Sequence, residues 1–256
     1  MSNPVVVVGH GPHNVIALHG WFGSAKSWGP WVDALDTDAF TYAFVDYRGY
    51  GARKDVPGTY NLEEIAEDVL SVADKLGWKR FSLLGHSMGG AAIQHVLAAH
   101  PERVRALVGI SPVPASGVPF DEATLRFFES AAEDAQVRRT IHDRGTGSRL
   151  SGRWLDRMVE NSMERSTPAA VAAYLHSWVK TDISSRVQGM ELPVHVIVGE
   201  FDGAINEAFV RKTWLTCYPN ASVEVMQNAG HYAMDETPAA LAASVERFLR
   251  SVPLSD

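Results

Sequence analysis

The sequence has almost no cysteine, no excess of positive charge and no long apolar run, and each shortage excludes a class of protein. Cys217 is the only cysteine in 256 residues, which excludes an internal disulfide and favours a reducing, cytoplasmic environment. The formal net charge of −7 provides no basic surface for nucleic acid. No apolar run reaches the roughly 18 residues that would predict a membrane span. Met1–Pro4 lack the pattern of a signal peptide, so none is expected.

Short apolar runs alternate with helical patterns along most of the chain. Strands are expected over residues 5–9, 14–18, 41–46, 81–84, 104–110, 194–199 and 223–226. Helices are expected between them: one from Ser24 to about Leu35, one starting at Asn61, and one over Pro238–Leu249 with Thr237 as N-cap. This alternation predicts an α/β fold with a mostly parallel central sheet flanked by helices on both faces.

One segment breaks the alternation. Residues 119–182 contain helical patterns and no strand pattern, with helices expected over 121–143, over 151–166 and from Thr167 onward. We therefore predict a helical cap over 119–182, inserted into a core formed by residues 1–118 and 183–256.

The most informative motif is Gly85-His86-Ser87-Met88-Gly89, which has the pattern G-x-S-x-G. An expected strand precedes it and an Ala-rich helical segment follows, which is the context of a nucleophile elbow. Such a tight turn brings strand and helix backbones together, so glycine is favoured at both ends of the motif and Ser87 is expected to be strained. The Met88 N–H is expected to lie unpaired at the start of the helix.

Four blocks along the chain resemble the α/β-hydrolase superfamily in its compact, capped serine-esterase form. Besides the elbow, three blocks carry the resemblance. His19-Gly20-Trp21-Phe22 is similar to the family's oxyanion loop and Gly199-Glu200-Phe201-Asp202 to its acid turn. Gly230-His231-Tyr232-Ala233-Met234-Asp235-Glu236 is similar to its histidine loop. The order Ser, Asp, His is also the order of that family. The resemblance implies an α/β-hydrolase fold with Ser87, Asp202 and His231 as a catalytic triad.

The residue types suit acyl transfer. A serine hydroxyl needs a base to become a nucleophile, and the base needs a third group to orient it. In this interpretation Ser87 attacks, His231 moves the proton and Asp202 holds the imidazole. The resemblance implies the backbone N–H groups of Trp21 and Met88 as the oxyanion hole. Four aromatic residues are candidates for the substrate-binding wall, with core packing as the alternative for those in the cap: Phe22, Trp154, Tyr174 and Trp178.

Several other polar residues fit structural roles better. We expect His19 to brace its loop, His86 to lie under the elbow, and Asp46 with Arg48 to hold a turn. The histidines and carboxylates show no H-E-x-x-H or similar ligand spacing, so no metal and no cofactor are predicted.

The sequence thus predicts a serine hydrolase that cleaves a small or medium carboxylic ester or lactone through an acyl-enzyme on Ser87. The same site on the same fold leaves open a C–C hydrolase, a lyase, an amidase or a perhydrolase, and a further alternative is a non-enzymatic small-molecule receptor. Dehalogenases and epoxide hydrolases are disfavoured, because their nucleophile is Asp where this chain has Ser87. The expected partner is a small ester or acyl compound, with neither nucleic acid nor membrane.

Overall fold

The computed structural model describes residues 5–254, so the expectation about a signal peptide at Met1–Pro4 lies outside the described residues. The described strands form one seven-stranded sheet in the order β1-β3-β2-β4-β5-β6-β7. Their bounds are β1 (Val5–Gly9), β2 (His13–Leu18), β3 (Phe40–Val45), β4 (Phe81–His86), β5 (Val104–Ile110), β6 (Val194–Gly199) and β7 (Ala221–Met226). Only β1 is antiparallel to its neighbour, β3, and all other pairings are parallel, which confirms the predicted sheet.

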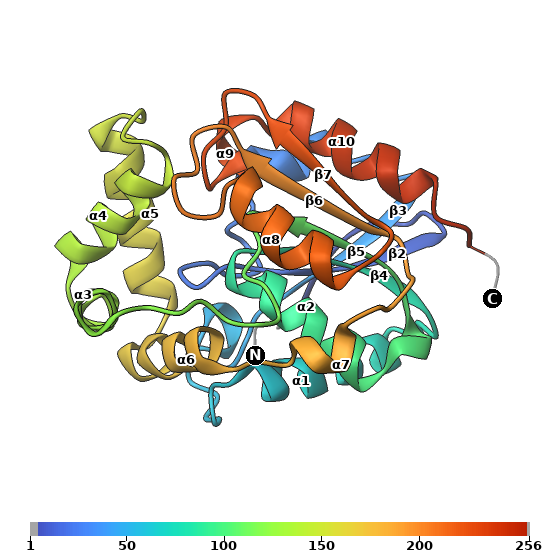
Figure 1. Cartoon of the computed structure of the whole chain (residues 1–256), viewed down its shortest axis with the longest axis horizontal. Coiled ribbons are helices and arrows are strands. Elements are labelled where there is room, and N and C mark those ends of the chain that lie inside the picture. Colours follow the sequence, from blue (N-terminus) through green and yellow to red (C-terminus); the bar gives the residue numbers. More distant parts are fainter. Residues whose placement is uncertain (1–4, 255–256) are drawn as a thin grey trace.

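Helices cover both faces of this sheet (Figure 1). The α-helices are α1 (Leu62–Lys75), α2 (Met88–Ala99), α3 (Glu122–Ser130), α4 (Ala135–Gly145), α5 (Gly152–Arg165), α6 (Pro168–Lys180), α7 (Ser184–Val187), α8 (Glu207–Cys217), α9 (Ala233–Glu236) and α10 (Pro238–Arg250). The 3-10 helices are η1 (Gly29–Ala34), η2 (Gly51–Arg53) and η3 (Pro101–Arg103). None of the helices in the described part is both long and apolar enough to cross a membrane.

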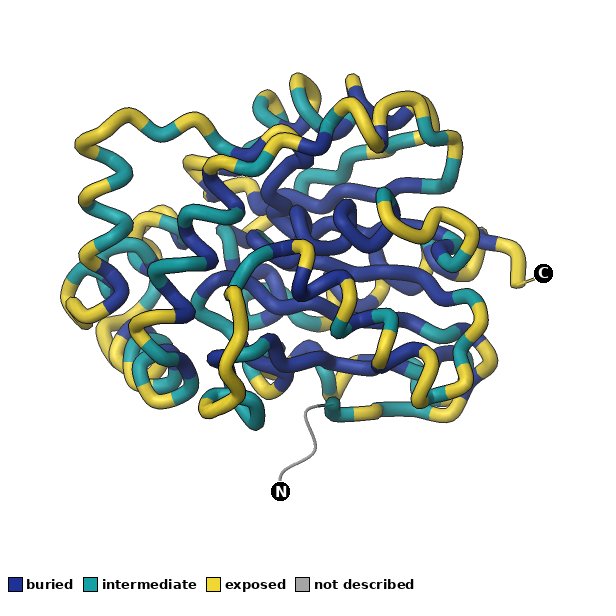
Figure 2. The backbone as a smooth tube through the Cα atoms, turned by 90° about the horizontal axis from the view of Figure 1, so that it is seen from below, coloured by how far each residue is buried: buried dark blue, intermediate teal, exposed yellow. Residues whose placement is uncertain are grey.

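The sheet divides the apolar core in two, because successive side chains of a strand point to opposite faces. Ile16 and Leu18 of β2 pack in the core shared with α1, α2 and α8. Val15 and Ala17 of the same strand pack in the core shared with η1, α9 and α10. Figure 2 shows the consequence: the central strands are buried along their length, and the exposed residues lie on the outer helices and loops.

Polar side chains begin many of the helices. Among the described helices, six start at a residue whose side chain accepts a backbone N–H of the first turn: Asn61, Asp121, Asp134, Ser151, Thr167 and Asn206. Each such cap satisfies a donor that the helix itself leaves unpaired, and each contributes about 1 kcal/mol. The helix starts expected at Asn61 and at Thr167 are therefore confirmed.

One local prediction about a helix is wrong. The α-helix expected from Ser24 to Leu35 is instead a turn, in which the Ser24 hydroxyl pairs with that of Ser27 at 2.9 Å, followed by η1. Gly29 has a positive φ of 55° and Pro30 lacks an N–H, so an α-helical hydrogen-bond ladder cannot run through this segment. Thr237 is the N-cap residue of α10, as predicted, although its hydroxyl donates to the Ala233 carbonyl (3.3 Å) and makes no cap hydrogen bond.

The segment between β5 and β6 holds α3, α4, α5 and α6, which lie together at one side of the sheet (Figure 1, left). Within the described residues its one strand-like pairing is an isolated bridge between Ser166 and Tyr50. The four helices fall within the limits drawn for a cap, and the division into a cap over 119–182 and a core stays a prediction.

The elbow depends on a close approach of backbones. A Cβ on Gly85 would overlap the Gly89 carbonyl, and a Cβ on Gly89 would overlap the carbonyl of Leu18 at the end of β2. Strand β4, helix α2 and strand β2 therefore meet where only hydrogen fits, as the spacing of the two glycines predicts.

Replacing Gly89 with alanine should destabilise the fold, because the new methyl group forces α2 away from the Leu18 carbonyl. We expect a loss of about 3 kcal/mol in the free energy of unfolding, measured by urea titration. Gly203→Ala is the control: a Cβ there meets nothing within 4 Å, and the change should stay within about 0.5 kcal/mol of wild type. Equal stabilities of the two variants would contradict this account of the elbow.

Candidate active site

A cavity of about 520 Å³ lies where the elbow, the loop after β2 and the helices α3 to α6 meet. Its lining includes Ser87 from the elbow, Asp202 from the turn after β6 and His231 from the loop after β7. These side chains come from distant parts of the chain, and they meet because parallel strands place their carboxyl ends at one edge of the sheet. Trp21 and Phe22 line the same cavity.

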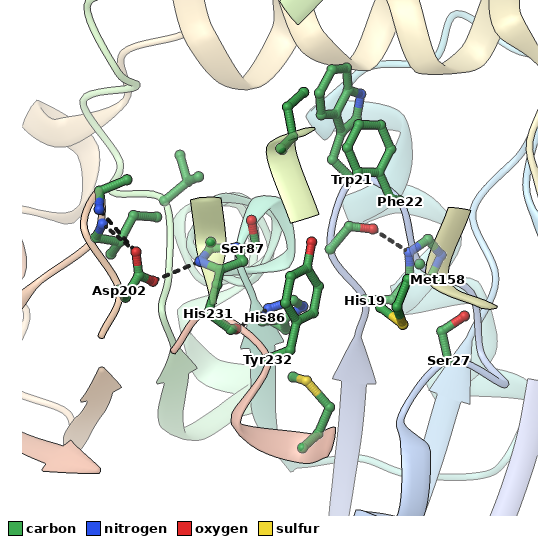
Figure 3. A pocket seen from close by; sticks show the side chains of 18 of the residues that line it. His19, Trp21, Phe22, Ser27, His86, Ser87, Met158, Asp202, His231 and Tyr232 are labelled. Carbon is green, nitrogen blue, oxygen red and sulfur yellow. Dashed lines mark hydrogen bonds and ion pairs between the residues drawn. The ribbon is translucent and has the colours of Figure 1, made fainter. Parts of the chain in front are cut away.

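Ser87 has a strained backbone, as the motif predicts, with φ 53° and ψ −118°. Hydrogen bonds hold it in place: its N–H donates to the Ile110 carbonyl (3.0 Å), and its carbonyl accepts from the N–H groups of Gly90 (2.8 Å) and Val113 (2.9 Å). The side chain is thereby directed into the cavity beside the ring of His231 (Figure 3).

Asp202 holds the imidazole of His231. His231 Nδ1 donates to Asp202 Oδ2 at 2.7 Å, and Asp202 Oδ1 accepts from the backbone N–H groups of Ala204 and Ile205, both at 3.0 Å (Figure 3). Burial alone would raise the pKa of Asp202, but His231 and the hydrogen bonds from His231 and Ile205 hold this pKa below its ordinary value. The carboxylate is thus ionised and orients the ring so that Nε2 is free for proton transfer.

One contact of the predicted triad, between Ser87 and His231, is not formed in the structure. Ser87 and His231 are both described, and no hydrogen bond joins the serine hydroxyl to the imidazole in the arrangement seen here. In hydrolytic sites this contact is often loose until a substrate is bound, so its absence is compatible with proton transfer between neighbouring side chains.

Two backbone N–H groups near Ser87 are unpaired. Neither Trp21 nor Met88 donates its backbone N–H to any group in the described part of the chain. Met88 is the first residue of α2, where no intrahelical acceptor exists. Gly20 brings the Trp21 loop against the elbow, since a Cβ on Gly20 would lie 3.2 Å from Ser87 Cβ. Both donors are therefore available to a developing oxyanion.

The structural roles predicted for neighbouring polar residues are confirmed. His19 Nδ1 donates to the Gly20 carbonyl at 2.8 Å, and His86 Nε2 donates to the His231 carbonyl at 2.9 Å. Asp46 accepts the backbone N–H of Ala52 at 2.9 Å, which holds the turn after β3, and that of Ala25 at 2.7 Å, which ties the loop after β2 to it. Arg48 pairs with Glu64 and Asp68.

The aromatic residues proposed for the substrate wall divide into two pairs. Phe22 and Trp178 line the cavity, whereas Trp154 and Tyr174 are not among its lining residues, so for these last two the alternative of core packing fits better. Tyr174 is fully buried among other tyrosines, with its ring 5.6 Å from that of Tyr50. The Trp154 ring packs edge-on against Tyr232 at 5.6 Å. Both side chains pack the segment between β5 and β6 against the rest of the chain.

Sequence reasoning missed a polar face of α5 that borders the cavity. Arg157, Met158, Asn161 and Arg165 line it from this helix. The spacing i, i+4, i+8 of Arg157, Asn161 and Arg165 was the available signal, because residues four apart share one side of a helix. No group of three or more His, Cys, Asp or Glu side chains with the geometry of a metal site occurs among residues 5–254.

Comparisons with known proteins agree with this architecture. The family model described as alpha/beta hydrolase fold matches residues 14–238. A pimeloyl-(acyl-carrier protein) methyl ester esterase of Pseudoalteromonas atlantica is 27% identical over 235 residues, covering 84% of this chain and 88% of that protein. The esterase YbfF of Escherichia coli is 25% identical over 252 residues, covering 94% of each. A solved structure of a bromoperoxidase from Bacillus anthracis has the same fold, with a TM-score of 0.87 at 19% identity over 96% of this chain and 94% of that one.

A buried histidine beside the site carries a consequence for acid stability. His142 of α4 is fully buried, its ring lies 5.2 Å from that of Tyr232 and 5.3 Å from that of Phe22, and neither ring nitrogen has a described partner. Burial, with smaller effects of His231 and Arg138, lowers the pKa of His142 to about 3. Because the unfolded chain binds this proton near pH 6.5 and the folded chain does not, stability falls as the pH drops from about 6.5 toward 3.

His142→Leu should remove this acid penalty. Relative to wild type, the free energy of unfolding of the variant should rise by about 2 kcal/mol more at pH 5 than at pH 8. Urea titrations of both proteins at the two pH values measure this difference. Parallel pH dependence of wild type and variant would contradict the assignment of a neutral, buried His142.

Proposed function

The chain belongs to the α/β-hydrolase fold family, and we propose that it is a serine hydrolase that cleaves a carboxylic ester through an acyl-enzyme on Ser87. The observation that carries the proposal is the 2.7 Å hydrogen bond between His231 and the buried Asp202, beside the strained Ser87 and in one cavity with it. This arrangement has the parts that nucleophilic acyl transfer requires: a nucleophile, a base and a group that orients the base.

The proposed reaction has two halves. Ser87 Oγ attacks the ester carbonyl carbon while its proton moves to His231 Nε2, and the N–H groups of Trp21 and Met88 bind the resulting oxyanion. The intermediate then expels the alcohol, which takes the proton from His231. In the second half, His231 removes a proton from water, the hydroxide attacks the acyl carbon, and the acid leaves as Ser87 regains its proton. Each backbone donor is worth about 3 kcal/mol of transition-state stabilisation.

Two further observations support an ester as substrate. The curated relatives from Pseudoalteromonas atlantica and Escherichia coli are both esterases by name. A cavity of about 520 Å³ suits a small or medium substrate. No specific observation favours the C–C hydrolase, lyase, amidase, perhydrolase or receptor alternatives over ester hydrolysis. The cytoplasmic location inferred from the single cysteine stays a prediction.

The lining of the cavity suggests the kind of ester. Much of the lining is apolar, with aromatic and aliphatic side chains from the β2 loop, α3, α6 and α8, among them Phe22, Phe128, Trp178 and Phe209. The lining also includes four cations: Lys26, Arg144, Arg157 and Arg165. Of the two lining carboxylates, Asp202 pairs with His231 and Asp235 with Arg157 (3.0 Å).

The remaining lining cations have no carboxylate partner in the described part of the chain: Lys26, Arg144 and Arg165. They stand out because the whole chain carries a net charge of −7. We therefore propose an ester whose acyl part is apolar near the reacting carbonyl and carries an anionic group at a distance from it, held by these cations.

Ser87→Ala should abolish hydrolysis of p-nitrophenyl esters, because no other group can form the acyl-enzyme. We expect kcat to fall by about four orders of magnitude or more. Wild type should also form a covalent adduct on Ser87 with a fluorophosphonate, seen by mass spectrometry. Ser27→Ala is the matched control, since Ser27 lines the same cavity but its hydroxyl bonds to that of Ser24, and this variant should keep most of its activity. Full turnover by Ser87→Ala would refute the proposal.

An anionic acyl group should raise kcat/KM. We expect the p-nitrophenyl monoester of glutaric acid to be preferred over p-nitrophenyl butyrate by about five- to tenfold, since partly exposed charges contribute about 1 kcal/mol. Arg165→Gln should reduce this preference, and added salt should weaken it. Arg153→Gln, exposed on the same helix and outside the lining, is the control. A preference that Arg165→Gln leaves unchanged would contradict the role of the cations without affecting the proposed reaction.

A further inference from the structure

The loop that carries His231 is held by an unusual set of acceptors. Three consecutive backbone N–H groups, those of residues 230, 231 and 232, all point to partners outside the loop. Glu236 Oε2 accepts from Gly230 (2.9 Å) and Glu236 Oε1 accepts from Tyr232 (3.1 Å). The N–H of His231 donates to the carbonyl of Gly145, at the end of cap helix α4, at 2.8 Å. The carboxylate of Glu236 therefore accepts hydrogen bonds from the residues on both sides of His231.

This carboxylate is buried. The side chain of Glu236 is only 1% exposed, and such a group keeps its charge only with strong partners. Burial raises the pKa of Glu236, while the two N–H groups of the loop and the charge of Arg149 oppose that rise. Arg149 Nη2 contacts Glu236 Oε2 at 2.5 Å and is the one side-chain cation paired with it in the described part of the chain.

Arg149 belongs to the segment between α4 and α5. It contacts the loop that carries His231 and the turn that carries Asp202. On the histidine side it donates to the Asn228 carbonyl at 3.3 Å as well as to Glu236. On the acid side its guanidinium lies over the ring of Phe201, the residue before Asp202, with 4.0 Å to the ring centroid. A single cap side chain thus bridges the loops that present the proposed base and its orienting acid.

We propose that Glu236 and Arg149 are positioning residues for His231, so that the cap holds the base of the active site in place. Glu236 fixes the backbone of the histidine loop, and Arg149 keeps Glu236 ionised and ties it to the cap. The inference rests on the proposed function, because it assigns His231 the role of the base. It goes beyond that function, because it makes docking of the α4–α5 end of the cap a condition for catalysis.

The neighbouring contacts agree with this coupling. Asp235, the residue before Glu236, pairs with Arg157 of α5 at 3.0 Å. A Cβ on Gly230 would lie 2.6 Å from the Gly145 carbonyl, so the loop and the end of α4 are packed backbone to backbone. Lifting this end of the cap would break the Gly145–His231 hydrogen bond and both ion pairs together.

The test compares Glu236→Ala, Glu236→Gln, Arg149→Gln and Arg149→Lys with wild type, with Arg153→Gln as the control for loss of an exposed cap arginine. Glu236→Ala should lower kcat by about 100-fold with a much smaller change in KM, since misplacing a catalytic group by about 1 Å has an effect of this size. Glu236→Gln keeps one acceptor oxygen, so its kcat should lie between those of wild type and Glu236→Ala. Arg149→Lys should recover most of the kcat lost in Arg149→Gln, because it restores the charge next to Glu236.

A spectroscopic readout separates positioning from general stability. The His231 Nδ1 proton, hydrogen-bonded to Asp202, should give a low-field proton NMR resonance in wild type and in Arg153→Gln. It should broaden or shift in Glu236→Ala and Arg149→Gln, and return in Arg149→Lys. If Glu236→Ala fails to fold, Glu236→Gln, Arg149→Gln and Arg149→Lys test the positioning role through the same two measurements, kcat and the NMR resonance.

The outcomes distinguish this inference from the proposed function. An inactive Ser87→Ala together with unchanged kcat and unchanged resonance in the folded Glu236 and Arg149 variants would overturn the positioning role and leave the ester hydrolase standing. An active Ser87→Ala would overturn the proposed function, and with it the role of His231 as base. A fall in kcat that Arg153→Gln reproduces would also overturn the inference, because it would reflect a general effect of cap charge.

Discussion

The hydrogen bond between His231 Nδ1 and Asp202 Oδ2 is the contact on which the site depends, and it requires that the charge of Asp202 be stabilised by the groups around it. Its carboxylate is fully buried, so its charge must be compensated locally. The backbone N–H groups of Ala204 and Ile205 supply this compensation from the turn that follows β6. Because these donors are backbone groups, the position of Asp202 follows from the path of the chain, and the ring of His231 follows from Asp202.

The hydrogen bond also requires that the loop carrying His231 lie close to the turn carrying Asp202. A Cβ on Gly199 would overlap the Gly230 carbonyl, so the acid turn and the histidine loop touch where β6 and β7 end. The bulk of a side chain at Gly199 would push these two loops apart, and with them the residues that present Asp202 and His231. Parallel strands of similar length thus do more than form a core: their aligned ends hold the loops at the spacing that the proposed chemistry requires.

The parts of this molecule that sequence reasoning predicted well are those with local causes. Strand positions follow from apolar runs, the helix start at Asn61 follows from a side-chain cap, and the strained Ser87 follows from flanking glycines at fixed spacing. The errors have the opposite origin. Nothing near Tyr174 in the sequence indicates that it packs against Tyr50, and the turn at Ser24 depends on a left-handed Gly29 that the helical pattern concealed. The contact of Glu236 with Arg149 joins residues 87 positions apart, so it could be seen only in the folded chain.

The helices between β5 and β6 do more than cover the candidate site, because they also hold two of its residues in place. The Trp21 indole Nε1 donates to the Val171 carbonyl of α6 at 2.8 Å, so the loop that presents one proposed oxyanion donor is tied to that segment. The N–H of His231 is tied to Gly145 at the end of α4. Two of the residues that the proposed reaction uses, Trp21 and His231, are therefore anchored in these helices, whereas Ser87 and Asp202 are anchored at the ends of sheet strands. It follows that changes in these helices can alter the rate of the chemical step as well as the choice of substrate.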